Sequence, residues 1–333
     1  MIRRLSLAAL AVTALTLAAC GGDDSSSEAS PSTEATGGDC STITEGKLTI
    51  ATGNPAYSPW VENDAPESGE GYEAAVALAV AKELGYEGEN VVWVRTDFDA
   101  AIQPGAKDFD FNLQQYSITP ERAETISFSD PYYAGNQAIV ALAGSAAEGA
   151  TTVADLVDVK FGAQAATTSL AFITDVIKPT NEPFVYDDNA GAKAALEAGQ
   201  IDAIVVDLPT ALYISAVEIE GSSVIGQFPA SAGGTTDEFG FVFEKDNPLV
   251  ACVNTALATL KGNGSLDEFA KQWLSDNAGV PVITELTITG TALLDSVVAG
   301  DFYRIRISRD GTHTSDALTA DACLVACEIR DAT

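Results

Sequence analysis

Short apolar runs alternate with helical patterns along most of this chain, and the alternation occurs twice in succession. The runs rich in β-branched and aromatic residues, which are expected to be strands, lie at residues 47–51, 91–94, 109–113, 137–142, 159–163, 183–186, 201–206 and 239–243. The stretches with helical periodicity or capping residues lie at residues 71–84, 96–102, 167–177, 189–198, 247–260 and 265–274. Strands that alternate with helices of this length are typical of parallel sheets. The sequence therefore predicts an α/β protein built from two successive units, with a last strand that crosses back to the first unit.

The turn at residues 114–122 (Gln-Gln-Tyr-Ser-Ile-Thr-Pro-Glu-Arg) follows one of these strands. Thr119 has the residue type and the position of a helix N-cap, with a proline after it at the first helical position. Arg122 then lies in the first turn, where free N–H groups and the helix dipole already make the helix end positive. A cation there is explained if the site binds an anion such as a carboxylate. Alternatively, Arg122 pairs with Glu121 or Glu124 on a solvated turn.

Length and charge limit the classes of function. A chain of 333 residues, of which 46% are hydrophobic, is long enough for two domains with a sizeable core. Its formal net charge of -31 makes nucleic acid an unexpected partner, because phosphate binding requires a basic surface.

The first residues have the features of an export signal. Two arginines at positions 3 and 4 precede an apolar stretch at residues 5–17, which is too short and wrongly flanked for a membrane span. The stretch ends in Leu-Ala-Ala-Cys, which resembles a bacterial lipobox. We therefore expect residues 1–19 to be a lipoprotein signal peptide and Cys20 to carry lipid, which would hold the chain on the extracytoplasmic face of the cell membrane. A plain secretory peptide that is cut elsewhere is the alternative.

Two segments outside the α/β pattern differ in composition from the rest. Residues 20–40 are rich in Gly, Ser, Asp, Glu and Thr and are expected to form a flexible tether. Residues 284–333 have no clear periodicity, and we treat them as an appended tail of unknown structure. Four cysteines other than Cys20 could form disulfides in three ways, and the sequence alone does not choose among them: Cys40, Cys252, Cys323 and Cys327. Neither a metal nor a cofactor is expected, because no tight Cys/His cluster exists.

Four polar features lie at the expected carboxyl ends of strands, which is where ligands bind in open α/β sheets. They are the loop at residues 54–60, the turn at 117–122, the pair Thr167 and Thr168, and Asp207. A free α-amino acid needs this combination, because its carboxylate requires a guanidinium, its ammonium a carboxylate, and its side chain an aromatic surface. Each feature also has a structural explanation, since the carboxylate and the threonines could cap helices and the aromatic residues could belong to the core.

The same stretches resemble the amino-acid-binding receptors of ABC importers, bacterial extracellular solute-binding protein family 3. The resemblance rests on residues 117–122, 128–133 (Phe-Ser-Asp-Pro-Tyr-Tyr), 167–169 (Thr-Thr-Ser) and 199–207, and it covers about residues 46–283. It implies a two-lobed α/β fold like that of type II periplasmic binding proteins. In such a fold two mixed or parallel sheets are joined by two crossing strands, and the ligand lies in the cleft between the lobes.

The resemblance also implies lobe boundaries and a disulfide. Lobe I is expected to comprise residues 41–137 and 242–283, and lobe II residues 138–241. Cys252 would then lie on a helix that packs on lobe I, close to Cys40 at the start of that lobe, so we expect a Cys40–Cys252 disulfide. A monomer is the default for this architecture.

For the charged groups of a ligand, the resemblance implies the following roles. Arg122 would hold the α-carboxylate, helped by the backbone of Ser117 and by the region of Thr167 and Thr168. Asp207 would bind the α-ammonium.

For the rest of the ligand, the resemblance implies contacts with aromatic and amide side chains. Tyr57 and Phe98 would sandwich the ligand, with Trp60 nearby. Asn54 stands where relatives that bind cationic amino acids often carry an acid, which argues against a strict binder of lysine, arginine or histidine. Gln115 stands where relatives often have a smaller residue, and it could contact the ligand or narrow the pocket. The expected ligand is a polar neutral amino acid.

The function implied is that of a lipid-anchored receptor, not an enzyme, which captures a free amino acid and delivers it to an ABC transporter permease. An enzyme in the same cleft is an alternative, because the related cyclohexadienyl dehydratases catalyse eliminations there. Its acid or base would have to be Asp207, Glu70 or Glu73, since the single histidine, His313, lies in the tail. A sensory ligand-binding module is a further alternative, although a lipid anchor cannot by itself carry a signal across a membrane.

Overall fold

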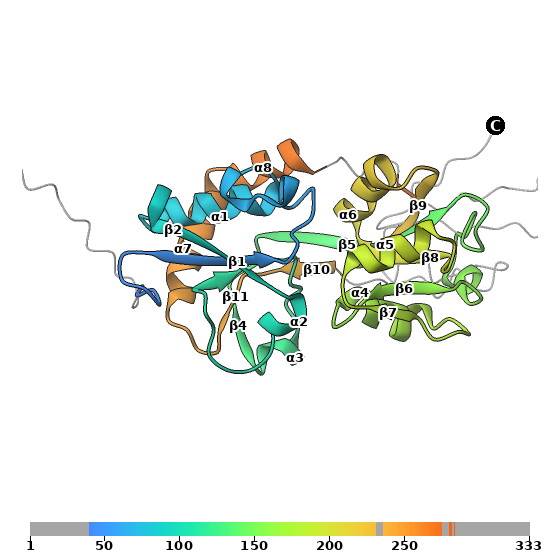
Figure 1. The fold of residues 1–333 in the computed structure, drawn as a ribbon, viewed down its shortest axis with the longest axis horizontal. Coiled ribbons are helices and arrows are strands. Elements are labelled where there is room, and N and C mark those ends of the chain that lie inside the picture. Colours follow the sequence, from blue (N-terminus) through green and yellow to red (C-terminus); the bar gives the residue numbers. More distant parts are fainter. Residues whose placement is uncertain (1–39, 231–235, 275–279, 282, 284–333) are drawn as a thin grey trace, which may run out of the picture. The chain divides into compact units, whose positions relative to one another are not determined.

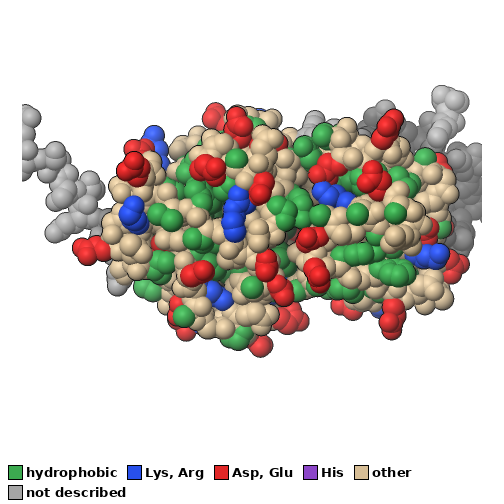
Figure 2. Space-filling view, in the orientation of Figure 1, with side chains coloured by type: hydrophobic (Ala, Val, Ile, Leu, Met, Phe, Trp, Pro, Cys, Tyr) green, Lys and Arg blue, Asp and Glu red, His purple; other side chains and the backbone are tan. Residues whose placement is uncertain are grey.

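The computed structural model describes residues 40–230, 236–274, 280–281 and 283. The expected signal peptide, the tether up to residue 39 and the tail lie outside the described residues, and so do Cys20, Cys323 and Cys327. Within the described part of the chain, no helix has the length and apolar character that a membrane span requires. Acidic side chains are scattered over the face shown in Figure 2, with few lysines or arginines between them, in keeping with the net charge of -31.

The first sheet has five strands in the order β2-β1-β3-β11-β4 (Figure 1). Its strands are β1 (Leu48–Gly53), β2 (Val91–Thr96), β3 (Phe111–Asn112), β4 (Ile126–Phe128) and β11 (Val242–Glu244). The central strand β1 pairs in parallel with β2 and β3, whereas β11 is antiparallel to β3 and β4. Because β11 comes from late in the sequence, the chain returns to the first sheet after it has built the second.

Both faces of the first sheet are covered, which explains why all six residues of β1 are buried. Helices on one face are α1 (Tyr72–Glu83), α7 (Leu249–Gly262) and α8 (Ser265–Trp273) (Figure 1). Leu48 and Ile50 of β1 pack on this face, in a buried cluster that includes Val80 of α1 and Leu257 of α7. Ala51 packs in a separate cluster with residues of α2 (Phe98–Ala101), because successive strand side chains alternate between the faces.

The second sheet has six strands in the order β10-β5-β8-β6-β7, and β9 pairs with β5. The strands are β5 (Tyr133–Leu142), β6 (Phe161–Gln164), β7 (Phe184–Tyr186), β8 (Ala203–Asp207), β9 (Ser222–Phe228) and β10 (Thr236–Phe239). Strand β6 is parallel to β7 and β8, whereas β5 is antiparallel to β8, β9 and β10. The remaining helices and turns are α3 (Pro120–Ala123), α4 (Thr168–Phe172), α5 (Asn189–Glu197), α6 (Leu208–Tyr213), η1 (Glu62–Asp64), η2 (Pro66–Ser68), η3 (Gly88–Asn90), η4 (Val153–Leu156), η5 (Ile173–Ile177) and η6 (Ile214–Glu218). The predicted α/β class with two mixed sheets is confirmed.

Two crossings connect the sheets, as predicted, but the return strand differs from the expectation. The expected single strand at residues 239–243 is divided into β10 and β11 at Gly240. Strand β10 pairs with β5 in the second sheet, with Phe239 opposite Tyr133, and β11 pairs in the first sheet. A Cβ atom on Gly240 would lie 2.9 Å from the side chain of Ile118 and 3.1 Å from the carbonyl oxygen of Ser129, so a larger residue here would force these neighbours to shift.

Helix caps depend on residues within one turn, and three of those expected from the sequence form, whereas Asp97 makes no side-chain cap bond at the start of α2. The cap oxygen accepts the N–H three residues later, at Thr119 from Arg122 (3.2 Å), at Thr167 from Leu170 (3.1 Å) and at Asp207 from Thr210 (2.9 Å). The sequence Ser-Leu-Asp-Glu at residues 265–268 also predicts a capping box, and this prediction is wrong. Helix α8 is preceded by Gly264, with φ 83°, and the N–H of Ser265 donates to Asn263 Oδ1 at 3.0 Å, so that Ser265 is already the first helical residue.

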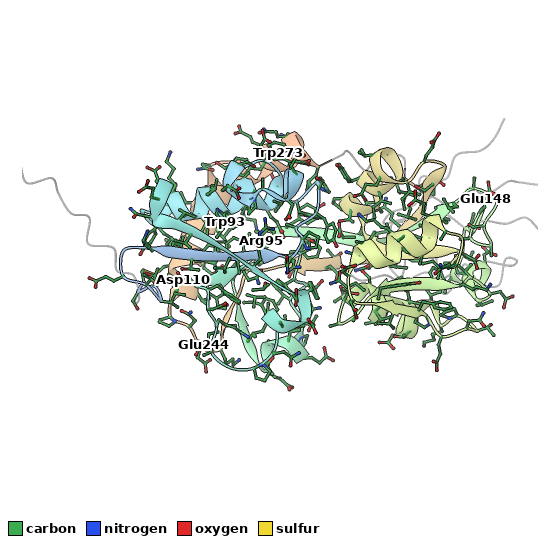
Figure 3. The ribbon with its side chains drawn as sticks, viewed as in Figure 1. Trp93, Arg95, Asp110, Glu148, Glu244 and Trp273 are labelled. Carbon is green, nitrogen blue, oxygen red and sulfur yellow. A yellow bond between two sulfur atoms is a disulfide. The ribbon has the colours of Figure 1, made fainter. Side chains whose placement is uncertain are left out.

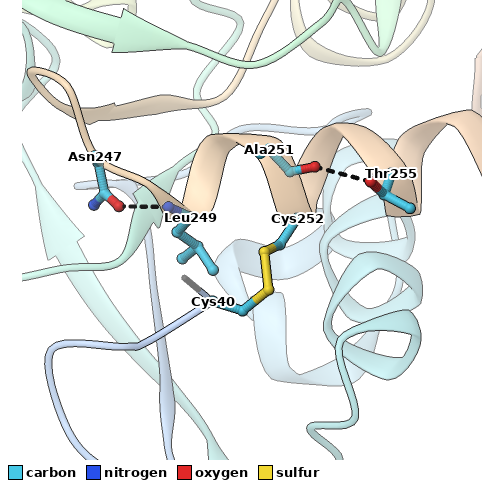
Figure 4. The surroundings of a disulfide bond; sticks show 6 residues. All are labelled: Cys40, Asn247, Leu249, Ala251, Cys252 and Thr255. Carbon is cyan, nitrogen blue, oxygen red and sulfur yellow. Dashed lines mark hydrogen bonds between the residues drawn. A yellow bond between two sulfur atoms is a disulfide. The ribbon is translucent and has the colours of Figure 1, made fainter. Parts of the chain in front are cut away.

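The expected Cys40–Cys252 disulfide is present and joins the first described residue to α7 (Figure 4). The two Cα atoms lie 5.9 Å apart, and the bond closes a loop of 212 residues. Asp110 holds the same end of the lobe, because its carboxylate accepts the N–H groups of Ile43 (2.7 Å) and Thr49 (2.6 Å) (Figure 3). The start of β1 is therefore tied both covalently and by hydrogen bonds.

Candidate functional site

A cavity of about 50 Å³, here called the inner pocket, has walls from both sheets and from the strands that connect them. Eight predicted site residues line it: Tyr57, Phe98, Gln115, Ser117, Arg122, Thr167, Thr168 and Asp207. A second cavity of about 350 Å³, here called the outer cavity, shares part of this wall: Pro55, Tyr57, Phe98, Gln114 and Gln164. The two cavities are therefore adjacent parts of one cleft, and the fold brings most of the predicted residues together in it.

Arg122 contributes a half-buried cation to the inner pocket. Its Nη1 donates to the carbonyl oxygen of Ser117 and its Nη2 to that of Ala166, both at 2.8 Å, and its guanidinium carbon lies 5.5 Å from the centre of the Phe98 ring. Burial lowers the pKa of Arg122, although the group keeps its charge at any ordinary pH. The alternative pairing with a neighbouring glutamate is not among the ion pairs of the described residues. The cation is thus hydrogen-bonded to neutral carbonyl groups and takes part in no ion pair of the described residues, although the carboxylate of Asp237 is close enough to attract it.

Hydroxyl groups lie beside this cation on both sides of the cleft. Ser117 Oγ and Thr168 Oγ1 are 3.0 Å apart, and they connect the first lobe to the N-terminus of α4. Thr167, which precedes Thr168 on the second lobe, uses its hydroxyl to cap α4 and to donate to Gln164 O at 2.7 Å. These groups offer hydrogen bonds to a carboxylate that pairs with the guanidinium.

Asp207 contributes the carboxylate of the inner pocket, at the end of β8. Its Oδ1 accepts the N–H of Thr210 at 2.9 Å, and its Oδ2 accepts the hydroxyl of the same residue at 2.8 Å. Burial raises the pKa of Asp207 to about 6, with the bonds from Thr210 acting in the opposite direction. The two explanations considered for Asp207 are therefore compatible, because one carboxylate both caps α6 and lines the pocket.

Aromatic rings form further parts of the wall. Phe98 stacks on Tyr116, with ring centres 4.6 Å apart, and this contact fixes its ring below the guanidinium of Arg122. Tyr57, on the loop after β1, also lines the pocket, and Lys193 Nζ lies 4.9 Å from its ring centre. Both rings face the inner pocket and the outer cavity, where they could contact a bound side chain.

The structure corrects the expected place of Trp60. Its side chain is 0% exposed and does not line the inner pocket. Its ring packs edge-on against Tyr72, Tyr133 and Phe239 at centre distances of 5.8, 5.3 and 5.7 Å, so it belongs to the core behind the pocket. Asn54 also lies outside the inner pocket, because the loop directs it to the outer cavity.

Gln115 faces the inner pocket, but its backbone and side-chain N–H groups are bonded to the core. Its N–H donates to Glu73 Oε1 at 2.8 Å, and its side-chain amide donates to Glu73 Oε2. Glu73 is 2% exposed, also accepts the hydroxyl of Tyr132, and has its pKa raised by burial to about 7. Two roles were expected for Gln115, a contact with the ligand or a narrowing of the pocket. These contacts agree better with the second role.

Sequence reasoning missed a buried polar pair on the two connecting strands. The amide of Gln137, on β5, donates to Asp237, on β10, and to Thr168 Oγ1 at 3.3 Å. Its carbonyl oxygen accepts the hydroxyl of Ser169 at 2.7 Å. Both members of the pair are buried, and burial raises the pKa of Asp237. The only sign of this pair in the sequence was a glutamine within an apolar strand, because its partner lies 100 residues away.

The outer cavity is acidic on both sides of the cleft. Four aspartates line it, two from the first lobe and two from the second: Asp97, Asp99, Asp187 and Asp188. No lysine or arginine is among the described residues of its wall. An anionic group in this part of the cleft would therefore be repelled.

The sequence model of the family described as bacterial extracellular solute-binding proteins, family 3, matches residues 48–276. The lysine/arginine/ornithine-binding periplasmic protein of Escherichia coli (strain K12) is 28% identical to this chain over 238 residues, which cover 66% of this chain and 85% of that protein. Among solved structures, an ancestral arginine-binding protein bound to arginine has a TM-score of 0.58 and 28% identity, covering 69% of this chain and 99% of that one. The ancestral amino acid-binding protein AncCDT-1, a precursor of cyclohexadienyl dehydratase, has a TM-score of 0.56 and 30% identity, covering 69% and 96%.

Proposed function

The chain belongs to family 3 of the bacterial extracellular solute-binding proteins and has the type II periplasmic-binding-protein fold, and on that premise we propose that it is a receptor for a free α-amino acid. The receptor binds the amino acid in the inner pocket and delivers it to the permease of an ABC importer. One observation carries the proposal. Arg122 and Asp207 line the same small cavity, yet neither takes part in an ion pair of the described residues.

The guanidinium of Arg122 and the carboxylate of Asp207 face one cavity but form no ion pair with each other. This arrangement favours a ligand that itself carries both a carboxylate and an ammonium group. The α-carboxylate pairs with the guanidinium of Arg122 and replaces at least one of its carbonyl partners, because a charged acceptor binds a guanidinium more strongly. The α-ammonium donates to Asp207, whose oxygens already accept bonds from Thr210 and can accept more. A zwitterionic amino acid thereby neutralises both groups.

The side chain of the ligand is proposed to be polar and uncharged. Tyr57 and Phe98 supply ring surfaces to its apolar part, and the neutral amide of Asn54 borders the adjacent outer cavity. The four aspartates of that cavity disfavour an acidic side chain. A cationic side chain is the competing outcome, because it would gain from these aspartates and because the names of several relatives specify arginine.

Binding is favoured over catalysis by the position of the candidate acids. The name of AncCDT-1 connects it with a dehydratase, so an enzyme on this fold is the second candidate. Of the acids considered for such a reaction, Glu73 is buried behind Gln115 and does not line the inner pocket, and Asp207 is held as a helix cap. The single observation in favour of an enzyme is the pKa of Asp207, which burial raises to about 6.

The proposal includes a lipid anchor at Cys20 on the extracytoplasmic face of the membrane. It rests on the lipobox-like sequence, since this residue lies outside the described part of the chain. A Cys20→Ser variant is expected to leave the membrane fraction, and a Cys323→Ser variant to remain in it. Equal membrane fractions for all three proteins would contradict the anchor.

Thermal unfolding of the chain from residue 21 onward, with each of the common L-amino acids in excess, tests the receptor. An amino acid present at a hundredfold excess over its Kd raises the free energy of unfolding by about 2.7 kcal/mol. We expect one or a few polar amino acids to raise the midpoint, and Arg122→Ala and Asp207→Ala to abolish the shift. Glu121→Ala, one residue away on the exposed side of α3, is the matched control and keeps the shift.

A purified protein that already holds its ligand would show no shift, and the same measurement after denaturation, dialysis and refolding removes that explanation. The absence of any shift after refolding would contradict the receptor for an amino acid. A shift that survives Arg122→Ala would contradict the proposed site.

A further inference from the structure

Trp60 and Thr210 connect the two lobes by a hydrogen bond that lies behind the inner pocket. Trp60 Nε1, from the loop after β1, donates to Thr210 Oγ1 on α6 at 2.8 Å, across 150 positions of sequence. Neither residue lines the inner pocket, and both are buried, at 0% and 7% exposure. The contact therefore depends on how closely the lobes approach rather than on the atoms of a ligand.

A second hydrogen bond runs from Thr210 to Asp207, and the donor and the acceptor of both bonds are fixed. An indole N–H can donate but cannot accept, so the oxygen of Thr210 must be the acceptor. The single hydroxyl hydrogen of Thr210 is then free to donate to Asp207 Oδ2, at 2.8 Å. Trp60, Thr210 and the pocket carboxylate thus form one ordered series of hydrogen bonds, which ends on the group proposed to bind the α-ammonium.

The surroundings of Trp60 make this bond sensitive to closure of the lobes. Its ring packs against Tyr133 and Phe239, which are paired with each other on β5 and β10, the strands that connect the lobes. Helix α6 belongs to the second lobe, whereas the loop of Trp60 belongs to the first. A hinge motion at the connecting strands would separate Thr210 from Trp60 and break a buried hydrogen bond.

We propose that Trp60 and Thr210 form a latch that is already partly closed in the free protein, as the bond between them shows, and is stabilised in its closed form when an amino acid binds. In that form it fixes the orientation of the Asp207 carboxylate. The proposal rests on the proposed receptor function and adds two positioning residues that do not touch the ligand. In the open state, Trp60 no longer donates to the hydroxyl oxygen of Thr210. The hydroxyl group can then rotate, and the carboxylate of Asp207 loses a hydrogen-bond donor of fixed orientation. The latch therefore slows release of the ligand more than it affects capture.

Two readouts test the latch, with Thr210→Val as the main variant and Thr210→Ser as the matched control. Valine keeps the shape of threonine and removes the hydroxyl, whereas serine keeps the hydroxyl. The first readout is the pair of rate constants for binding of L-glutamine, with L-arginine as a second probe. We expect Thr210→Val to raise the dissociation rate constant about 3- to 10-fold, the range that one hydrogen bond supports. The association rate constant should change by less than about twofold, and serine should restore the wild-type values.

The second readout is solvent exchange of the indole N–H groups, which gives three signals because the chain has three tryptophans. Trp93 on β2 and Trp273 on α8 serve as internal references (Figure 3), and Trp60→Phe assigns the third signal. Exchange of the Trp60 N–H should be several-fold faster in Thr210→Val than in the wild type, both with and without a probe, and the reference signals should not change.

The outcomes separate the latch from the receptor function. Equal dissociation rate constants and equal exchange in the wild type and Thr210→Val would overturn the latch while leaving the receptor intact. If neither probe binds the wild type, the proposed ligand class is wrong, and the latch is still judged by exchange in the free protein. In that case, faster exchange in Thr210→Val supports the bond between the lobes, and equal exchange overturns it.

Discussion

The guanidinium of Arg122 reaches across the cleft and donates a hydrogen bond to the carbonyl oxygen of Ala166, at 2.8 Å. The same group donates to Ser117 O on its own lobe, so one cation connects the two lobes. Ala166 itself has φ 60°, which is the left-handed region, and lies just before the cap of α4. The proposed site for the ligand carboxylate therefore has two features. The guanidinium of Arg122 can exchange a carbonyl partner for the carboxylate, and the backbone of Ala166 is held in an uncommon conformation.

Replacement of Arg122 by lysine should weaken amino-acid binding although the charge is kept. An ammonium cannot donate two parallel bonds to a carboxylate, so we expect a loss of about 1.5–3 kcal/mol, which corresponds to roughly 10- to 100-fold in Kd. Isothermal titration with the amino acid found in the thermal screen measures the change. An unchanged Kd would mean that the guanidinium is not the carboxylate site.

Replacement of Ala166 by glycine should stabilise the protein. The left-handed conformation costs an alanine more than a glycine, and the net gain expected after the entropy cost of glycine is about 0.5–1 kcal/mol. Ala165→Gly is the matched control, because Ala165 has no positive φ, and it should destabilise the protein by a similar amount. Urea unfolding measures both, and the same sign for the two variants would contradict the role of φ.

Affinity for the amino acid should fall as the pH is lowered through 6. Burial raises the pKa of Asp207 from 3.8 to about 6, and only the ionised carboxylate can pair with the α-ammonium. A group with a pKa of 6 is about one-tenth ionised at pH 5, so the Kd should rise up to about tenfold between pH 7 and pH 5. In Asp207→Asn, binding should be weaker at every pH and nearly independent of pH over this range. An equally steep dependence in that variant would assign the effect to another group.

Stability should fall between about pH 4.5 and pH 7 because of Glu73. Burial raises its pKa from 4.5 to about 7, so the folded state binds a proton that the unfolded state has lost in this interval. The free energy of unfolding therefore decreases as the pH rises through the interval. Glu73→Gln should show a flatter dependence on pH, whatever its absolute stability, and the exposed Glu121→Gln should keep the wild-type slope. Denaturant unfolding at several pH values provides the comparison.

Loss of the Cys40–Cys252 disulfide should destabilise the protein. The bond closes a loop of 212 residues, and chain-entropy estimates for long loops give about 3–5 kcal/mol. A Cys40→Ser/Cys252→Ser double variant should show this loss in urea unfolding, and Cys40→Ser alone should lose about the same. If peptide mapping without reductant finds both thiols free in the wild type, the bond itself is absent.

Local chemistry explains which parts of the fold could be predicted from the sequence. The caps at Thr119, Thr167 and Asp207 involve an N–H only three residues away, so the sequence contains both partners. The same reasoning failed at Ser265, where the side chain of Asn263 and the left-handed Gly264 start the helix instead. The division of the expected strand at 239–243 also depends on contacts that the local sequence does not contain.

By itself, the sequence determined the α/β class, the helix caps and the family-type motif that places Arg122 at the start of α3. Only the tertiary structure decided that Trp60 packs in the core and bonds to Thr210, and that Gln137 pairs with Asp237. The physical reason is distance along the chain. Strand and helix formation respond to neighbours within a few residues, whereas the burial and partners of a polar group depend on segments that meet only when two lobes form and approach each other.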